Sequence, residues 1–520
     1  LYQPHAFSVS MSREIMLEKD AWYPTDHDEN WHGTFGSGFD YMHTFDTCGT
    51  TITNCCAQLG SLPFWASDNS NTMSIGDNSG DYDIDGYQMG LGPITNTDGT
   101  VTLNPIIFQA GADFLLYVGA HRNQRGFFFK AHAPVGVISI NPNLTFTNTI
   151  DPQDYQPGLF NTQTGASPAV SAVPAPYSNI QQAFQGGIGY GWLDPMTHGL
   201  ININTLKATT FGDAELVAGY NLFANESGHL GIGVRLSIPT GNKAQGVYVL
   251  EPLFGRNGHW GIGGELIAHW KLWNSNNNRY VQFFFDGDAL HLCKSEQVRS
   301  FDLKENGLGS KYLLLARYIG NTANTAGNFQ NEILNAVNIT TIGVGSTFAI
   351  EGNFALGIQC FWDNWSFEAG YEGWGRTCEE LTLCSTCQNS INYNDFAVLG
   401  RQTPYSTATD TAVFLGLCQP TATINESVAQ INTFAPTSIV KDACLSANRL
   451  AEAPEDALDI DAQCAQAVYT SKAYAEFRYT WSENEYAPYL AITGGAEIPN
   501  IAKNQAVKFW NIGFNGGLAF

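Results

Sequence analysis

The last twelve residues of the chain, Phe509-Trp-Asn-Ile-Gly-Phe-Asn-Gly-Gly-Leu-Ala-Phe520, indicate the fold class. Side chains two residues apart point to the same face of a β-strand. The large apolar residues of this segment share one such register: Trp510, Ile512, Phe514, Leu518 and Phe520. The segment therefore predicts a strand with one apolar face that continues to the terminal phenylalanine.

The same two-residue period recurs in residues 125–138, 228–238, 259–272 and 472–481. In residues 125–138, Phe127 and Phe129 fall on one face, whereas Lys130 and His132 fall on the other. Aromatic residues also lie near the strand ends on the apolar faces, as in the interfacial girdles of membrane barrels. The alternative is a soluble β-sandwich, whose apolar faces would form the core.

Composition favours the barrel. The chain is 44% hydrophobic, 13% aromatic and only 14% charged, with 53 Gly, which suits strands and turns. No run of 18 apolar residues exists, which argues against a helical membrane protein, and a closed barrel is the other way to span lipid. The sequence predicts an all-β transmembrane antiparallel β-barrel of about 16 strands, within a range of roughly 14 to 18.

The sixteen candidate strands follow from the alternation and the turn residues between them. They lie at 31–45, 105–118, 125–140, 200–211, 212–223, 228–239, 246–254, 259–273, 279–291, 309–319, 338–350, 352–361, 364–374, 471–482, 486–497 and 506–520. Residues 1–30 are expected to form an N-terminal periplasmic or plug segment, and residues 31–520 the barrel. Insertions at 47–104, 141–199 and 375–470 are long enough to be functional loops, caps or plugs.

The net charge of the chain bears on what the protein binds, and its first residue bears on where the protein is located. The 48 acidic residues outnumber the 24 basic ones, giving a net charge of −24, so binding to nucleic acid is not expected. The chain starts at Leu1 with no export signal, which we interpret as a mature, exported protein of a bacterial outer membrane.

Eleven cysteines predict disulfides, because an exported chain meets an oxidising compartment. Zinc is the competing interpretation for Cys384 and Cys387, although no second pair of ligands accompanies them. The odd count leaves at least one thiol unpaired. The disulfide candidates lie in turn-rich stretches, where they would staple loops: Cys48, Cys55, Cys56, Cys378, Cys384, Cys387, Cys418, Cys444 and Cys464.

Two neighbouring segments carry a family resemblance. Gly212-Asp-Ala-Glu-Leu-Val-Ala-Gly-Tyr220 and Gly228-His-Leu-Gly-Ile-Gly-Val-Arg-Leu-Ser-Ile-Pro-Thr-Gly-Asn242 resemble paired strands of Gram-negative porin-like barrels. Residues 458–490 resemble porin-like proteins of intracellular or host-associated bacteria, and residues 509–520 are similar to the C-terminal signal that the outer-membrane assembly machinery recognises. The resemblance implies a barrel architecture, but fold analogy does not identify a solute.

The inward face of such a barrel carries charges of both signs. Two alternatives stay open, because these side chains could set solute selectivity or could pair with neighbours and solvate the wall. The predicted pore-lining residues are Lys130, His132, Arg235, Glu265, His269, Lys271, Arg317, Lys472, Glu476 and Arg478.

Few residues suggest chemistry. Asp81, Asp83 and Asp85 precede Gly86 as in the start of a calcium loop, but the twelfth position is Gly92 rather than glutamate, so an acidic surface loop is the alternative. No G-x-S-x-G or H-E-x-x-H motif occurs, and we expect neither an enzyme nor a cofactor other than weakly bound calcium.

The sequence thus predicts an outer-membrane porin or channel for passive diffusion of small hydrophilic solutes. Outer-membrane lipid, lipopolysaccharide and two further copies in a homotrimer are the expected partners. The second hypothesis is a structural or adhesive surface protein that uses the barrel as an anchor. The third is a soluble secreted binding protein.

Overall fold

The computed structural model describes residues 5, 9–22, 31–45, 71–76, 82–92, 99–122, 124–147, 153–154, 175–186, 193–225, 227–275, 279–307, 309–318, 329–384, 391–399, 405–406, 413–414, 421–422, 450, 453–481, 486–499 and 507–520. Within these residues, no helix is long and apolar enough to cross a membrane.

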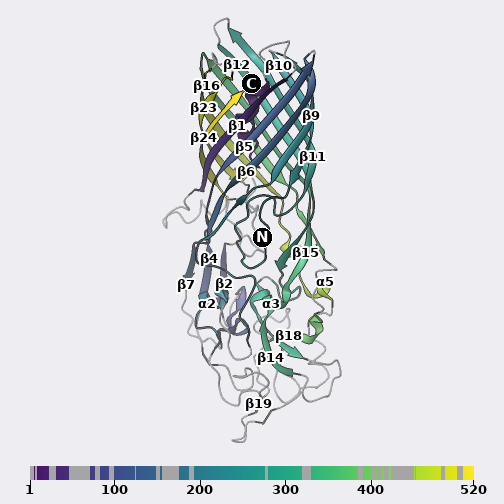
Figure 1. The fold of residues 1–520 in the computed structure, drawn as a ribbon. Helices are drawn as coiled ribbons and strands as arrows, with labels where there is room; N and C mark the ends of the chain where they lie inside the picture. Colours follow the sequence, from purple (N-terminus) through teal and green to yellow (C-terminus); the bar gives the residue numbers. More distant parts are fainter. Residues whose placement is uncertain are drawn as a thin grey trace.

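The main sheet has 14 strands, and twelve long ones form its ring. They are β1 (Trp31–Thr44), β5 (Ile106–Arg122), β6 (Arg125–Asn141), β9 (Ala214–Asn225), β10 (Gly228–Ile238), β11 (Gly261–Ser275), β12 (Arg279–Ser300), β15 (Thr341–Trp362), β16 (Trp365–Arg376), β22 (Val468–Thr480), β23 (Tyr489–Pro499) and β24 (Phe509–Ala519). Their order is β12-β11-β10-β9-β6-β5-β1-β24-β23-β22-β16-β15, and β15 pairs back to β12. The sheet is therefore a closed antiparallel barrel (Figure 1).

The first and last strands close the barrel together. Phe514 pairs with Phe39 and Leu518 with Phe35 along the β1–β24 ladder. The backbone N–H of Phe520 donates to the carbonyl of Gly33 at 2.9 Å, and the N–H of Gly33 donates to the carbonyl of Phe520 at 2.7 Å. A side chain at Gly33 would meet the Phe520 ring, so glycine permits this close approach.

The predicted number of strands is wrong. Residues 246–254 form no strand, and residues 338–350 and 352–361 belong to the single strand β15. Residues 200–211 contribute β8 (Leu206–Phe211), which is attached only to β6, and residues 309–319 contribute β13 (Leu314–Tyr318), which lies in another sheet. Local alternation cannot distinguish a strand of the ring from a strand of a loop, because both have the same period.

The two faces of the barrel have opposite character, as predicted. Phe127 is 73% exposed and Phe129 is 43% exposed, whereas Lys130 and His132 of the same strand are buried inside. Phe514, Leu518 and Phe520 are likewise exposed on the outer face. The soluble-sandwich alternative is wrong, because a sandwich would bury these apolar faces and expose the charges.

The two ends of the barrel differ. Connections 123–124, 226–227, 276–278, 363–364 and 481–488 are short and lie at the end where β24 finishes (Figure 1). At the other end the strands are joined by residues 45–105, 142–213, 239–260, 301–340, 377–467 and 500–508. Strands β12 and β15, of 22 residues each, continue past the barrel on this side, where β17 (Glu379–Leu383) pairs with β15.

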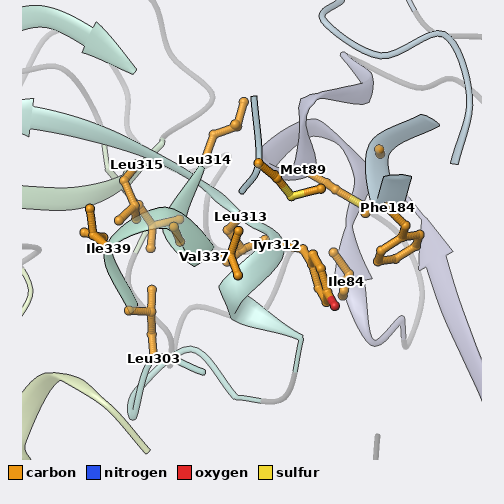
Figure 2. Close-up of a cluster of buried hydrophobic side chains, with 14 of the residues drawn as sticks. Ile84, Met89, Phe184, Leu303, Tyr312, Leu313, Leu314, Leu315, Val337 and Ile339 are labelled. Atoms are coloured by element: carbon orange, nitrogen blue, oxygen red, sulfur yellow. The ribbon is translucent and has the colours of Figure 1, made fainter. Parts of the chain in front are cut away.

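The long connections fold around a hydrophobic core of their own. One of its sheets has the order β3 (Ile84–Asp85), β2 (Thr72–Gly76), β4 (Gly99–Leu103) and β7 (Leu144–Thr147). The other has the order β14 (Phe329–Asn335), β13, β18 (Phe396–Leu399) and β21 (Thr421–Ala422). Tyr312, Phe184, Met89 and Val337 lie together in this core (Figure 2), and the rings of Phe184 and Tyr312 meet edge to face at 4.9 Å. The long connections therefore include a folded cap with its own apolar centre.

The smaller elements of the connections complete the fold. They are β2 (Thr72–Gly76), β3 (Ile84–Asp85), η3 (Tyr87–Leu91), β4 (Gly99–Leu103), β7 (Leu144–Thr147), α2 (Ile180–Gln185), η4 (Ser310–Tyr312), β14 (Phe329–Asn335), α3 (Ala336–Thr340), η5 (Tyr393–Asp395), β18 (Phe396–Leu399), β19 (Tyr405–Ser406), β20 (Val413–Phe414), β21 (Thr421–Ala422), α5 (Pro454–Ala457) and η6 (Asp461–Gln463).

Candidate functional site: the barrel lumen

An N-terminal segment, residues 9–22, lies in the lumen of the barrel. It consists mainly of helix α1 (Met11–Glu18) and the turn η2 (Lys19–Trp22). Every residue of α1 is buried, and the helix contacts β1, β5, β12, β15, β16 and β24. Strands from opposite sides of the ring therefore surround the helix.

The start of α1 is held by a carboxylate of the wall. Glu372 of β16 accepts hydrogen bonds from the backbone N–H of Met11 at 2.8 Å and from the hydroxyl of Ser12 at 2.6 Å. The Lys472 ammonium lies 3.0 Å from the same carboxylate and 2.7 Å from the Ser10 hydroxyl. A negative charge at a helix N-terminus is stabilised by the exposed N–H groups and the helix dipole.

Arg13 connects α1 to the opposite wall. Its Nε donates to Asp113 Oδ2 of β5 at 2.6 Å, and its guanidinium also pairs with Asp40 of β1. Asp40 and Asp113 are buried, as is Arg13 itself. A buried charge is tolerated only when it is paired and hydrogen-bonded, so these contacts fix the orientation of the helix.

Two glutamates on α1 meet cations from β6 and β10. Lys130 Nζ lies 3.1 Å from both Glu14 Oε2 and Glu18 Oε2, and Arg235 also pairs with Glu14. Glu265 of β11 completes this cluster, with Arg235 Nη1 at 3.0 Å from its Oε2. Wall and segment thus share one continuous network of buried ion pairs.

The end of the segment pairs with β16 and β22. Lys19 Nζ lies 2.7 Å from Glu476 Oε1 and also contacts Glu368, and all three side chains are buried. Asp20 Oδ2 accepts from Arg478 Nη1 at 2.6 Å. Removing one partner of a buried pair is strongly destabilising, so these contacts hold the segment in place.

Apolar contacts fill the space between the ion pairs. Met11, Ile15 and Leu17 belong to one buried cluster that includes wall residues Phe128 and Phe284. This packing and the ion pairs leave the segment buried over its whole helical length. The lumen is therefore occupied rather than open at the level of α1.

A second segment closes the lumen at the end with the long connections. Arg256, in the 239–260 connection, donates from Nε to Glu351 Oε1 at 2.6 Å and from Nη1 to Ser237 Oγ at 2.9 Å, and it also pairs with Glu215. Its backbone N–H donates to Asp213 at 2.5 Å. Burial raises the pKa of Asp213 to about 6, against the opposing effect of Arg256.

The predicted inward residues lie mostly where the alternation placed them. The structure buries Lys130, His132, Arg235, Glu265, His269, Lys472, Glu476 and Arg478 inside the barrel. Lys271 is partly exposed and lies with its ammonium 5.0 Å from the centre of the Tyr280 ring. Most of these charges pair with other buried side chains.

The prediction for Arg317 is wrong. This residue lies in β13, which belongs to the sheet of the long connections, and its guanidinium lies 5.9 Å from the centre of the Phe396 ring. Alternating apolar residues around Arg317 suggested a strand of the barrel. The error follows from the mistaken assignment of that strand.

Sequence reasoning offered a plug as one of two roles for residues 1–30, but it named none of the side chains that fill the lumen from outside the barrel strands. Four of them, Arg13, Glu14, Glu18 and Lys19, come from the N-terminal segment, and Arg256 comes from a connection. The available signal was a short helix-compatible segment, dense in charge, directly before the first strand. The local sequence pattern of this segment does not identify the strand that each charged side chain contacts.

Among the residues that the structure describes, two groups of buried side chains have metal-ligand composition. They are Glu14 with His132 and Glu215, and Glu18 with Glu265 and Asp286. Arg235 pairs with Glu14 and Glu215 of the first group, and Lys130 pairs with Glu18 and Glu265 of the second. The protein's own cations therefore occupy the places where a metal ion would bind.

The calcium hypothesis is not tested by the structure. Asp81 lies outside the described residues. Asp83 Oδ2 accepts from the backbone N–H of Ser74 at 2.7 Å, and Asp85 Oδ1 accepts from that of Tyr87 at 2.8 Å. The Asp83 carboxylate therefore bonds to β2, and the Asp85 carboxylate stabilises the turn at the start of η3.

The disulfide hypothesis is wrong for two of its cysteines. Cys378 and Cys464 carry free thiols. Cys384 takes part in a disulfide, and the remaining candidates lie outside the described residues: Cys48, Cys55, Cys56, Cys387, Cys418 and Cys444. Clustering in the sequence did not indicate pairing, because pairing requires matched Cβ positions in space.

Comparison with known proteins identifies only distant structural likenesses. No family model and no curated protein matches the chain. An outer membrane channel of Pseudomonas putida F1 aligns over 96% of this chain and 99% of its own, at 10% identity and a TM-score of 0.36. The outer membrane channel DcaP of Acinetobacter baumannii aligns over 94% and 96%, at 11% identity and a TM-score of 0.21.

A Pseudomonas aeruginosa FadL homologue aligns over 97% of this chain and 95% of its own, at 8% identity and a TM-score of 0.27. These scores carry no argument about function.

Proposed function

We propose that this chain is a bacterial outer-membrane channel for small hydrophilic solutes, closed by its own N-terminal segment. The observation that carries the proposal is a closed barrel with an apolar outer face and a charged lumen that is filled by residues 9–22. In a closed barrel every strand is hydrogen-bonded to a neighbour on both sides, so no backbone N–H or C=O group at a strand edge is left unpaired. The barrel can therefore cross lipid.

The asymmetry of the ends supports an orientation. Outer-membrane barrels have short periplasmic turns and longer extracellular loops. On this basis the end that carries Phe520 faces the periplasm, and the cap formed by the long connections faces outward (Figure 1). The C-terminal strand is then available to the assembly machinery at the periplasmic side.

Conduction requires the N-terminal segment to move aside. The ion pairs and hydrogen bonds between the segment and the wall are contacts that water can replace once the segment leaves. The vacated lumen would then expose Lys130, Arg235 and Glu265, among others, as a lining of mixed charge. Opposed charges across a pore set its selectivity.

Planar-bilayer recording tests the proposal. Arg13→Gln removes one anchor of the segment, and we expect its open probability to exceed that of the wild-type protein at least tenfold, because breaking a buried pair costs about 3–5 kcal/mol. Lys304→Gln removes one positive charge from the exposed surface and serves as the matched control. Absence of open steps in all three proteins would overturn the channel proposal.

The second candidate is a structural or adhesive surface protein anchored by the barrel. The hydrophobic core of the long connections favours it, because a folded cap is more than a set of connectors. Silent bilayer recordings from folded protein would select this candidate. The homotrimer, the lipopolysaccharide contacts and the absence of enzymatic activity remain predictions.

A further inference from the structure

The Arg13 guanidinium lies between two carboxylates of the barrel wall. It pairs with Asp40 of β1, and its Nε donates to Asp113 Oδ2 of β5 at 2.6 Å. The Asn511 amide of β24 donates to Asp40 Oδ2 at 3.2 Å and so orients that carboxylate. Carboxylates bind the planar guanidinium group through charge-assisted hydrogen bonds. We call Asp40 and Asp113 the guanidinium site.

The Lys19 ammonium also lies between two carboxylates of the wall. It contacts Glu368 of β16 and lies 2.7 Å from Glu476 Oε1 of β22, and all three side chains are buried. The same Nζ lies 5.7 Å from the centre of the Phe284 ring of β12. The negative face of an aromatic ring attracts ammonium groups, including those of bound ligands. We call Glu368, Glu476 and Phe284 the ammonium site.

The cations of the wall have partners that stay in place when the N-terminal segment leaves. Lys130 contacts Glu265 of β11 and lies 3.7 Å from Asp286 Oδ2 of β12. Arg235 Nη1 lies 3.0 Å from Glu265 Oε2 and 3.4 Å from Asp288 Oδ2. Both cations therefore remain paired with carboxylates of the barrel strands in a vacated lumen.

Two carboxylates of the wall have no such partner. In the described part of the chain, the cation paired with Asp40 is Arg13, and the cation paired with Glu368 is Lys19. Among the described residues of the twelve ring strands, ten buried carboxylates also outnumber six buried ammonium or guanidinium groups. Clefts lined by one sign of charge concentrate ions of the opposite sign. Departure of the segment therefore leaves a lumen that attracts cations.

The two sites lie on one cross-strand row of the inner wall. Asp40 pairs with Gly513, Gly513 with Thr493, Thr493 with Glu476, and Glu476 with Glu368. Neighbouring strands lie about 4.8 Å apart, so about 14 Å of wall separates Asp40 from Glu476. Because the strands of such barrels are tilted by about 35–45°, the row also advances along the pore axis. A cation can therefore pass from one site to the other along the wall.

We infer that the solutes of this channel are small organic cations that carry a guanidinium or an ammonium group. In the closed channel, Arg13 and Lys19 occupy the sites that such solutes occupy in the open channel. The Phe284 ring favours an organic cation over a divalent metal ion, because Ca²⁺ and Mg²⁺ bind oxygen ligands. The inference rests on the proposed channel function and names its substrate class.

Block of single channels by agmatine, which carries one guanidinium and one ammonium group, tests the inference. In planar bilayers with a roughly tenfold KCl gradient, the reversal potential of open wild-type channels should give a K⁺ permeability roughly tenfold above that of Cl⁻. Agmatine should reduce the K⁺ current through the same channels, because it occupies the two sites. Both quantities are measured on open channels, so they do not depend on how often the segment leaves.

Four variants separate the contributions of charge and ring. Asp40→Asn and Glu368→Gln each remove one carboxylate, and we expect each to need at least tenfold more agmatine for half block and to lower the permeability ratio. Each serves as the second variant if the other does not fold. Phe284→Leu should weaken the block severalfold and leave the permeability ratio unchanged. Glu305→Gln removes an exposed carboxylate of the 301–340 connection and should behave as wild type.

The outcomes distinguish this inference from the channel proposal. Open channels that prefer Cl⁻, or equal block by agmatine in all variants, would overturn the inference and leave the channel proposal intact. Cation preference without block by agmatine would also overturn it, because the lumen would then admit inorganic cations without binding organic ones. Absence of open steps in every protein would overturn the channel proposal itself.

Discussion

The Lys19 ammonium lies 2.7 Å from Glu476 Oε1 inside the barrel, although the two residues are 457 positions apart in the chain. The same ammonium contacts Glu368, so one cation of the N-terminal segment neutralises carboxylates from two neighbouring strands. Because none of these groups reaches solvent, the pairing depends on the segment being inside the lumen.

Replacing Lys19 should therefore release the segment. Lys19→Gln leaves Glu368 and Glu476 buried without their shared cation, which costs about 3–5 kcal/mol. We expect proteolysis of the N-terminal segment to become at least tenfold faster, measured by mass spectrometry of the fragments. Lys304→Gln should behave as wild type, and equal cleavage of both variants would contradict the role of the pair.

Arg256 should hold the 239–260 connection against the lumen. Arg256→Ala removes the cation between Glu215 and Glu351, so the connection loses its anchor. We expect trypsin to cleave after Lys243 at least tenfold faster than in wild-type protein, as followed by gel electrophoresis. Unchanged cleavage would mean that other contacts, such as Asn242 with Pro252, hold the connection without Arg256.

Glu379 should make stability depend on acid pH. Burial alone would raise the pKa of Glu379, but Arg299, the Ser346 hydroxyl and the Ala465 N–H lower it to about 2. A lowered folded-state pKa gives stability that is present above the ordinary value of 4.5 and is lost as pH falls toward 2.

The expected contribution is about 3 kcal/mol. Urea unfolding of wild-type protein and Glu379→Gln should differ by about this amount at pH 7, and the difference should shrink as pH approaches 2. A difference that stays constant from pH 7 to pH 2 would show that the carboxylate charge is not responsible.

Two free thiols distinguish lipid-facing from water-facing surface. Cys360 is exposed on the outer face of β15, whereas Cys378 is exposed beyond the end of β16. In phospholipid vesicles, a water-soluble maleimide should label Cys378 at least tenfold faster than Cys360, because lipid covers Cys360. Peptide mass spectrometry gives both rates, and equal rates in the folded protein would contradict the membrane location.

Much of the barrel could be predicted from sequence. The faces of residues 125–138 were predicted correctly, because a strand sends alternate side chains to opposite sides whatever its partners are. The pairing of the last strand with the first was not predicted, although the terminal register of Phe514, Leu518 and Phe520 made it testable. The number of strands was wrong because β13 and residues 246–254 have strand-like patterns outside the ring.

Of the side chains that meet in the lumen, the sequence predicted only those that come from the barrel strands. Lys130, Arg235 and Glu476 were expected on the inner face, but their partners Glu14 and Lys19 were not expected to meet them. The sequence shows that each charged side chain has to contact water or an oppositely charged group. It does not show which of these the side chain contacts.

The sequence by itself determined which side of each strand is apolar and that an apolar strand ends at Phe520, because these properties depend on a local two-residue period. Only the tertiary structure decided that twelve strands close, that residues 9–22 occupy the lumen and that Asp40, Glu476 and Glu368 share one cross-strand row. Those relationships depend on strand register and ring closure between segments distant in the chain, which no local pattern encodes.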